Sequence, residues 1–277
     1  SVNLPPSVGT SSMNVNFGQL NNKGLDLSLS AQIIRNKDWF WSVTLTGGHV
    51  MDQIRKISEG LKNDIDNPYD SSKPKILFVE GGSQYDIYAM RSAGIDPATG
   101  KEIFIKKNGE YTFNYDEKER VAVGNTNPIL QGSLMNTLRY KGFSISVATS
   151  YTFGSDYFNS TLKNKVENID LNYNVDRRVF TDRWKEPGDH TRFLGIGTSS
   201  SSSQYSERFV EKRNELYISS IQVMYDFAPK AITRLGLRKL AIGFGLSDIA
   251  HISTVKFERG TEYPYCRGIN LIFRPTF

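Results

Sequence analysis

The sequence has little of the residues and motifs on which most enzymes depend. Cys266 is the single cysteine among 277 residues, which excludes an intrachain disulfide and a thiolate metal cluster. The three histidines, His49, His190 and His251, show no metal-ligand spacing. No P-loop, G-x-S-x-G or H-E-x-x-H motif occurs. Since no acid–base or nucleophile set converges, we expect a protein that is not an enzyme.

Long apolar runs are also missing. No stretch of 18 or more apolar residues occurs, so no transmembrane helix is predicted. The opening SVNLPPSVGT has neither the charged region nor the apolar segment of a signal peptide, and it resembles the middle of a longer chain. The net charge of +5 is spread along the sequence, which gives little support to nucleic-acid binding. A membrane location stays open, because membrane-spanning β-strands alternate apolar and polar residues.

What the sequence does contain indicates an all-β protein. It is rich in tyrosine, phenylalanine and glycine, with 14, 16 and 23 residues. In the first alternating segment Leu25, Leu27 and Leu29 share a face, opposite Asp26 and Ser28. Such period-2 alternation predicts strands. It occurs in seven segments: residues 24–34, 39–48, 129–140, 143–153, 215–227, 240–249 and 267–277.

The connections between these segments are short on one side and long on the other. Tight turns lie at residues 36–38 and 141–142, whereas the connections at 48–128 and 155–214 are long. This asymmetry is typical of an antiparallel transmembrane β-barrel with short periplasmic turns and long extracellular loops. A soluble all-β sandwich, acting as a carbohydrate-binding or interaction domain, would show the same alternation, and we keep it as the alternative.

Aromatic residues lie beside the short turns and in the apolar phase of the strands. Rings of this kind favour the membrane–water interface, so we predict a periplasmic aromatic girdle. Its members are Trp39, Trp41, Tyr140, Phe143, Tyr225 and Phe227.

Seven strands cannot close a barrel of the usual bacterial kind, which needs an even number. We therefore expect the chain to supply roughly the last seven strands of a larger barrel, with residues 1–13 as the remainder of an extracellular loop.

Several blocks of the sequence resemble the C-terminal barrel region of SusC-like TonB-dependent outer-membrane transporters of Bacteroidetes. They occur in the family's order over nearly the whole chain: NNKGLDLSLSAQIIRNKDWFWSVTLTGG, GIDPATGKEIFIKKNGEYT, NPILQGSLMNTLRYKGFSISVATSYTFGSDYFN, DRRVFTDRWKEPGDHTRF, RNELYISSIQVMYDFAPKAITRLGLRKLAIGFGLSDI and GINLIFRPTF. The resemblance implies that residues 1–277 are the C-terminal portion of a 22-strand-type barrel, without the N-terminal plug and the first strands.

The same resemblance implies a function and partners. A protein of this family imports a large nutrient, such as a glycan or peptide, across the outer membrane of a Gram-negative bacterium. Its partners would be a SusD-like surface lipoprotein, TonB, the remainder of the same barrel and plug, and outer-membrane lipid. The terminal Phe277, in phase with Phe273, resembles the family's assembly signal.

Candidate substrate contacts lie in the long loops. Aromatic faces stack on sugars and pack against peptide side chains, and the aromatic loop residues we select are Tyr111, Phe113, Tyr115, Tyr157 and Phe158. We read IDPATGKE as a turn and the DRW segment, Asp182–Arg183–Trp184, as loop architecture.

One acidic loop raises the question of a metal ion. Asp64, Asp66 and Asp70 could hold Ca²⁺, but the loop lacks the later glycine and glutamate of an EF-hand. We therefore favour a solvated acidic loop and expect no cofactor.

Overall fold

The computed structural model describes residues 2–3, 12–13, 18–57, 78–169, 172, 174–197, 205–233, 236–256 and 266–277. The chain divides into two compact units, each built from separate stretches of sequence. The sheet unit comprises residues 24–50, 128–155 and 212–277, and the loop unit comprises residues 1–23, 51–127 and 156–211.

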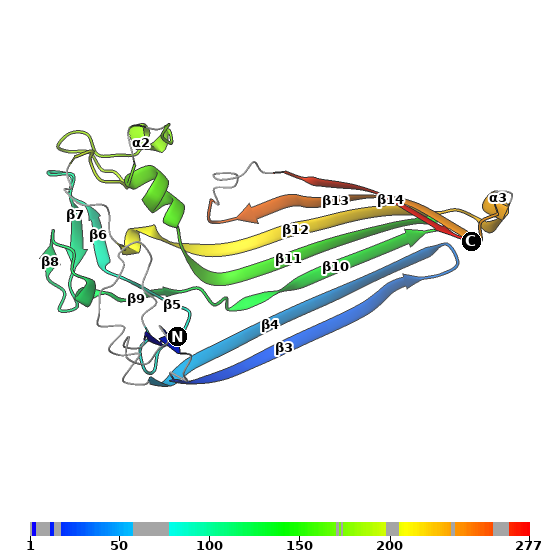
Figure 1. Ribbon diagram of the computed structural model, residues 1–277, viewed down its shortest axis with the longest axis horizontal. Helices are drawn as coiled ribbons and strands as arrows, with labels where there is room; N and C mark the ends of the chain where they lie inside the picture. The colour runs from blue at the N-terminus through cyan, green and yellow to red at the C-terminus, as the bar shows by residue number, and fades with distance from the viewer. Residues whose placement is uncertain are drawn as a thin grey trace. The chain divides into compact units, whose positions relative to one another are not determined.

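A seven-stranded sheet is the main feature of the described chain, in the order β14-β13-β12-β11-β10-β4-β3 (Figure 1). Each of the seven alternating segments forms one of its strands, and neighbours in the sequence are neighbours in the sheet. The pairs β10–β4, β10–β11, β12–β13 and β13–β14 are antiparallel. The strands are β3 (Gly18–Arg35), β4 (Trp39–Ile57), β10 (Leu130–Tyr140), β11 (Phe143–Phe158), β12 (Val210–Asp226), β13 (Lys239–Ser253) and β14 (Gly268–Thr276).

The tight turns form where the sequence predicts them. Between β3 and β4, the Asn36 side-chain oxygen accepts hydrogen bonds from the backbone N–H groups of Asp38 (3.1 Å) and Trp39 (2.7 Å). This Asx geometry closes the turn through the side chain of one of its own residues. Between β10 and β11, Lys141 adopts a positive φ of 50°, and its N–H donates to the carbonyl oxygen of Asp38 at 2.8 Å.

The two faces of the sheet differ in chemistry. One face carries hydroxyl groups that bond across strands, as Ser30 does with Thr44 (3.1 Å) and Thr46 with Ser133 (2.8 Å). On the opposite face the register aligns apolar residues, for example Leu138 with Ile145. The hydroxyl face suits water, and the apolar face suits a lipid environment.

Most of the apolar face is not covered by other described residues. Leu25, Leu27 and Leu29 are 75%, 53% and 54% exposed, and Leu271 is 81% exposed. In a sandwich these side chains would pack against a second sheet. The membrane-barrel type of antiparallel sheet predicted from the sequence is therefore confirmed, while the size of the complete barrel stays a prediction.

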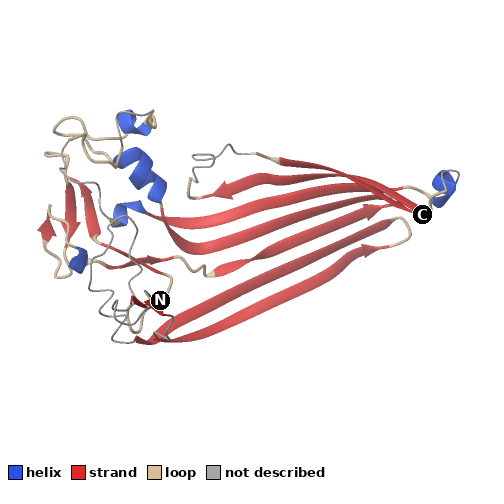
Figure 2. Cartoon of the chain, in the orientation of Figure 1, coloured by secondary structure: helices blue, strands red, loops and turns tan. Residues whose placement is uncertain are grey.

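The loop unit contains short elements that period-2 alternation does not predict (Figure 2). In the sequence these stretches appear only as long loops, because strands of two to five residues are too short to show a period. The elements are β5 (Asp86–Ala89) paired with β9 (Val121–Asn125), a sheet in the order β6-β7-β8 (Arg91–Ile95, Glu102–Ile105, Tyr111–Thr112), two 3-10 turns (Glu117–Glu119, Glu207–Phe209), the π-helix η3 (Leu162–Glu167) and α2 (Arg178–Thr181).

Three further elements complete the described chain: the pair β1 (Val2–Asn3) and β2 (Ser12–Met13), and the single-turn helix α3 (Pro229–Ile232). None of the described helices has the length and apolar character needed to cross a bilayer.

A small hydrophobic core holds the loop unit together. It is formed by Leu162, Val166, Val179, Phe193 and Phe209, with Phe158, Ile169 and Val175 packed against it. The loops therefore form a folded unit with its own buried side chains, which can present surface residues in defined positions.

Candidate functional site

Two loop segments that are far apart in sequence dock on each other. The indole N–H of Trp184 donates to the carbonyl oxygen of Pro97 at 2.8 Å, and the N–H of Gly188 donates to the same oxygen at 2.9 Å. The Asp96 side chain accepts from the Ala98 N–H (3.1 Å) and the Thr99 hydroxyl (2.6 Å). The predicted turn at IDPATGKE is thus confirmed, and it forms the platform for Trp184.

Arg183 is also part of the loop architecture, as predicted. Its guanidinium is buried and donates to the carbonyl oxygens of Leu194 (2.7 Å), Val166 (3.0 Å) and Glu167 (3.0 Å). Burial lowers its pKa, and the nearby Glu167 opposes that shift. Because its donors serve backbone oxygens, Arg183 is a structural residue of the loop unit.

A buried ion network joins three segments of the loop unit. The Arg208 guanidinium contacts Glu102 at 2.7 Å and Glu167 at 2.8 Å, and all three side chains are almost fully buried. Burial opposes the charge on Arg208, but the hydrogen bonds that its guanidinium donates to the Glu102 and Glu167 carboxylates outweigh this effect and raise the pKa of Arg208. Removing one partner of such a group leaves a buried charge unpaired, which lowers the free energy of unfolding by about 3–5 kcal/mol. The network therefore fixes β7 relative to η3.

The five loop aromatics selected from the sequence do not lie together. Phe158 packs against Tyr205 and Phe209, with ring centroids 5.4 and 6.0 Å apart, and contributes to the core. Tyr115 packs edge-on against Phe104 at 5.6 Å. Phe158 and Tyr115 are therefore packing residues, and Tyr157 is half-buried at the end of β11.

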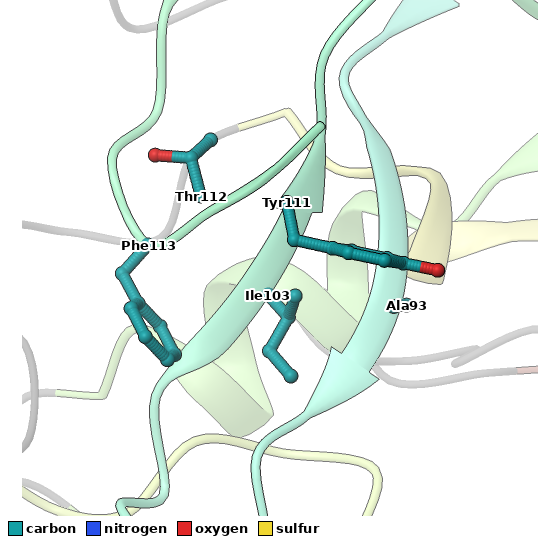
Figure 3. A pocket seen from close by; sticks show the side chains of 5 residues that line it. All are labelled: Ala93, Ile103, Tyr111, Thr112 and Phe113. Atoms are coloured by element: carbon teal, nitrogen blue, oxygen red, sulfur yellow. The ribbon is translucent and has the colours of Figure 1, made fainter. Parts of the chain in front are cut away.

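Tyr111 and Phe113 differ from the other three because they are exposed, at 71% and 53%. They line an open hollow of about 420 Å³ together with Ala93, Ile103 and Thr112. Ile103 lies between the two rings, and Ala93 lies beside the Tyr111 ring (Figure 3). Of the predicted substrate contacts, Tyr111 and Phe113 are brought together at this surface hollow.

The predicted girdle residues gather at the turn end of the sheet. The rings of Trp39 and Tyr140 are 4.3 Å apart, those of Phe143 and Tyr225 are 4.5 Å apart, and Phe227 meets Tyr225 at 4.9 Å. Tyr140 is also the register partner of Phe143, so the rings form a row across several strands. Trp41 pairs with Leu138 one step further along, and its indole N–H reaches Asn136 at 3.4 Å. The contact of this row with the membrane interface stays a prediction.

Phe273 lies on β14 and Phe277 just after it, and β14 ends beside the β12–β13 connection, where Thr276 pairs with Lys239. Phe273 and Phe277 are 62% and 80% exposed, and Phe273 pairs with Ile242 of β13. Their position agrees with an apolar stripe, and their role in assembly stays a prediction.

No metal centre is found among the residues that the structure describes, where no three His, Cys, Asp or Glu side chains are placed to share an ion. The acidic loop with Asp64, Asp66 and Asp70 lies outside the described residues.

The uncovered apolar face, the hydroxyl face and the short turns define the class of protein: this sheet is a wall segment of an outer-membrane β-barrel. The sequence is similar to TonB-dependent receptors. It is 24% identical over 294 residues to TonB-dependent receptor P39 of Formosa agariphila, covering 90% of this chain and 28% of the receptor. It is 25% identical over 178 residues to TonB-dependent receptor P3 of the same organism, covering 57% of this chain and 17% of the receptor. No protein-family profile matches the chain.

Solved structures show the same fold. The structure of the RagAB peptide transporter matches with a TM-score of 0.73 and 20% identity, over 92% of this chain and 28% of that chain. The RagAB peptide importer in its open-open state matches with a TM-score of 0.71 and 21% identity, over 92% of this chain and 27% of that chain. The chain thus spans under a third of the proteins that it matches.

These matches confirm the resemblance to TonB-dependent outer-membrane transporters and the outer-membrane location that the sequence predicts. The relatives and neighbours are named as receptors and transporters, not as enzymes.

Proposed function

We propose that this chain forms the C-terminal part of the barrel of a TonB-dependent importer in the outer membrane of a Gram-negative bacterium. The observation that carries the proposal is the seven-stranded sheet with one uncovered apolar face and one hydroxyl face. A soluble binding domain would leave its leucines in water at a large hydrophobic cost. The similarity to TonB-dependent receptors along 90% of the chain supports the same proposal.

The importer would act by binding and conformational change, without covalent chemistry and without a cofactor. TonB would supply energy from the inner membrane, and a plug inside the complete barrel would move. A SusD-like lipoprotein would cover the outer side, a proposal supported by the similarity to transporters described as RagAB complexes. The imported nutrient would be large, a glycan or a peptide.

The test uses the full-length protein in its own bacterium. We expect it in the outer-membrane fraction, as a heat-modifiable barrel that copurifies with a surface lipoprotein after mild detergent extraction. Deleting its gene should abolish uptake of one class of oligosaccharide or peptide, and deleting TonB should do the same. Recovery in a soluble fraction without detergent would overturn the proposal. Recovery of a lone monomer after mild extraction would contradict the proposed lipoprotein partner.

A further inference from the structure

The hollow between Tyr111 and Phe113 has a chemistry that favours one class of occupant. Its lining side chains are apolar, except for the hydroxyl groups of Thr112 and Tyr111 (Figure 3). A sugar ring that entered it would lose hydration around several hydroxyls and find few partners for them. An aliphatic or aromatic side chain would gain contact with Ile103 and both rings without leaving polar groups unpaired.

The strand that carries Tyr111 also presents an open backbone edge. In the order β6-β7-β8, β8 lies at the edge of its sheet within the described residues. Lys106 donates its N–H to the Glu110 carbonyl at 2.9 Å, so these two residues form a hydrogen-bonded pair. Because hydrogen-bonded and non-hydrogen-bonded pairs alternate in antiparallel sheets, the next pair, Ile105 with Tyr111, is of the second kind. The backbone N–H and C=O of Tyr111 therefore point away from β7.

An occupant that satisfies both features needs an apolar side chain and a free amide backbone. An extended peptide has both, since backbone hydrogen bonds to a sheet edge supply affinity and a pocket for one side chain supplies specificity. An oligosaccharide cannot supply the alternating N–H and C=O groups. We propose that the hollow and the edge of β8 bind an extended peptide that carries an aromatic or aliphatic side chain.

This inference rests on the proposed import function for its biological meaning, because it names peptide as the nutrient class. The binding itself is independent of transport and can be measured on purified protein. Tyr111 and Phe113 are exposed and lie outside the loop core, so their replacement is compatible with folding. Phe180 of α2 is a matched control, because it is 57% exposed and does not line the hollow.

The experiment is titration calorimetry on the detergent-purified full-length protein with any copurifying lipoprotein. The probes are the capped peptide Thr-Val-Phe-Val-Thr, its Phe-to-Ser version, its version N-methylated at the phenylalanine, and maltoheptaose. We expect the first peptide to bind, and the serine and N-methyl versions to bind about tenfold more weakly. Tyr111→Ala and Phe113→Ala should each weaken binding of the first peptide about tenfold, and Phe180→Ala should leave it unchanged.

Several results would overturn the inference. Equal binding of the phenylalanine and serine peptides would show that the hollow is not used, and so would an unchanged affinity in Phe113→Ala. Binding of maltoheptaose that is lost in Tyr111→Ala would assign the hollow to a sugar. Loss of the copurifying lipoprotein in Phe113→Ala, with peptide binding intact, would make it a docking surface for that protein. In all these cases a normal outer-membrane fractionation would leave the proposed function standing.

Discussion

Trp184 lies against Gly100 so closely that only glycine fits there. A Cβ atom at position 100 would stand 2.5 Å from the indole ring, and the backbone φ of Gly100 is +68°. Together with the hydrogen bond from the Trp184 indole to the Pro97 carbonyl, this contact joins two blocks of sequence, since Trp184 and Pro97 are 87 residues apart. The loop unit therefore depends on a close approach that local sequence does not reveal.

Replacing Gly100 by alanine should loosen the loop unit. The added methyl group would collide with the Trp184 ring and would also strain the positive φ. Gly188→Ala is the matched control, because its φ is +105° but nothing lies within 4 Å of the added Cβ. We expect limited proteolysis of the full-length protein to cut the loop unit faster in Gly100→Ala than in Gly188→Ala. Equal cleavage rates would show that the contact with Trp184 contributes little.

The loop unit should lose stability in strong alkali through Tyr115. Burial raises the pKa of Tyr115 to about 12, whereas an unfolded tyrosine ionises near 10. Between these values the unfolded state binds fewer protons than the folded state, so stability falls as the pH rises. Through Tyr115, the free energy of unfolding falls by at most about 1.4 kcal/mol per pH unit.

The measurement is the protease resistance of the loop unit at about pH 9 and about pH 11. Tyr115→Phe keeps the ring against Phe104 but removes the titrating group. We expect the loss of resistance between the two pH values to be smaller in Tyr115→Phe than in the wild type. The same loss in both proteins would show that other groups dominate the alkaline transition.

Neighbouring residues of β3 should respond oppositely to a charge. Leu27 belongs to the uncovered apolar face, and Ser28 belongs to the face that carries the hydroxyl groups. A lysine on the lipid face of a barrel costs about 2–4 kcal/mol at the bilayer midplane and less near the interfaces. We therefore expect Leu27→Lys to reduce the amount of folded barrel in outer membranes, and Ser28→Lys to leave it near the wild-type level. A larger defect in Ser28→Lys would reverse the assignment of the two faces.

Phe277 should matter for assembly more than for stability. Its ring is 80% exposed and extends the apolar stripe that contains Phe273. A charge near the membrane interface costs roughly 0–1 kcal/mol, so folding energy alone predicts a mild effect of Phe277→Asp. Recognition of the terminal aromatic by the assembly machinery predicts a large one.

The measurement is the heat-modifiable, folded barrel in outer membranes of Phe277→Asp cells compared with the wild type. Phe277→Tyr, which keeps the aromatic ring, should restore assembly. Near-normal levels in Phe277→Asp would show that the terminal residue is a lipid-facing side chain and no signal.

The sequence by itself determined the sheet. The strands of a barrel wall have lipid on one side and a polar interior on the other. Apolar and polar residues therefore alternate along each strand with a period of two. This is why the segments beginning at Gly24, Trp39 and Phe143 could be placed as strands, with their turns, from the sequence alone. The alternation does not extend to the ends of all strands. The last residues of β4, up to Ile57, and of β11, up to Phe158, were therefore not predicted as strand.

Only the tertiary structure decided what the loops do. Glu102, Glu167 and Arg208 are far apart in the sequence, and no periodicity marks them as one buried network. Nor does residue type separate Tyr111, which is exposed beside a hollow, from Tyr115, which packs against Phe104. The physical reason is that burial in the loop unit arises from long-range contacts between short segments. In the sheet, the alternation along each strand already decides which side chains face lipid and which face the polar interior.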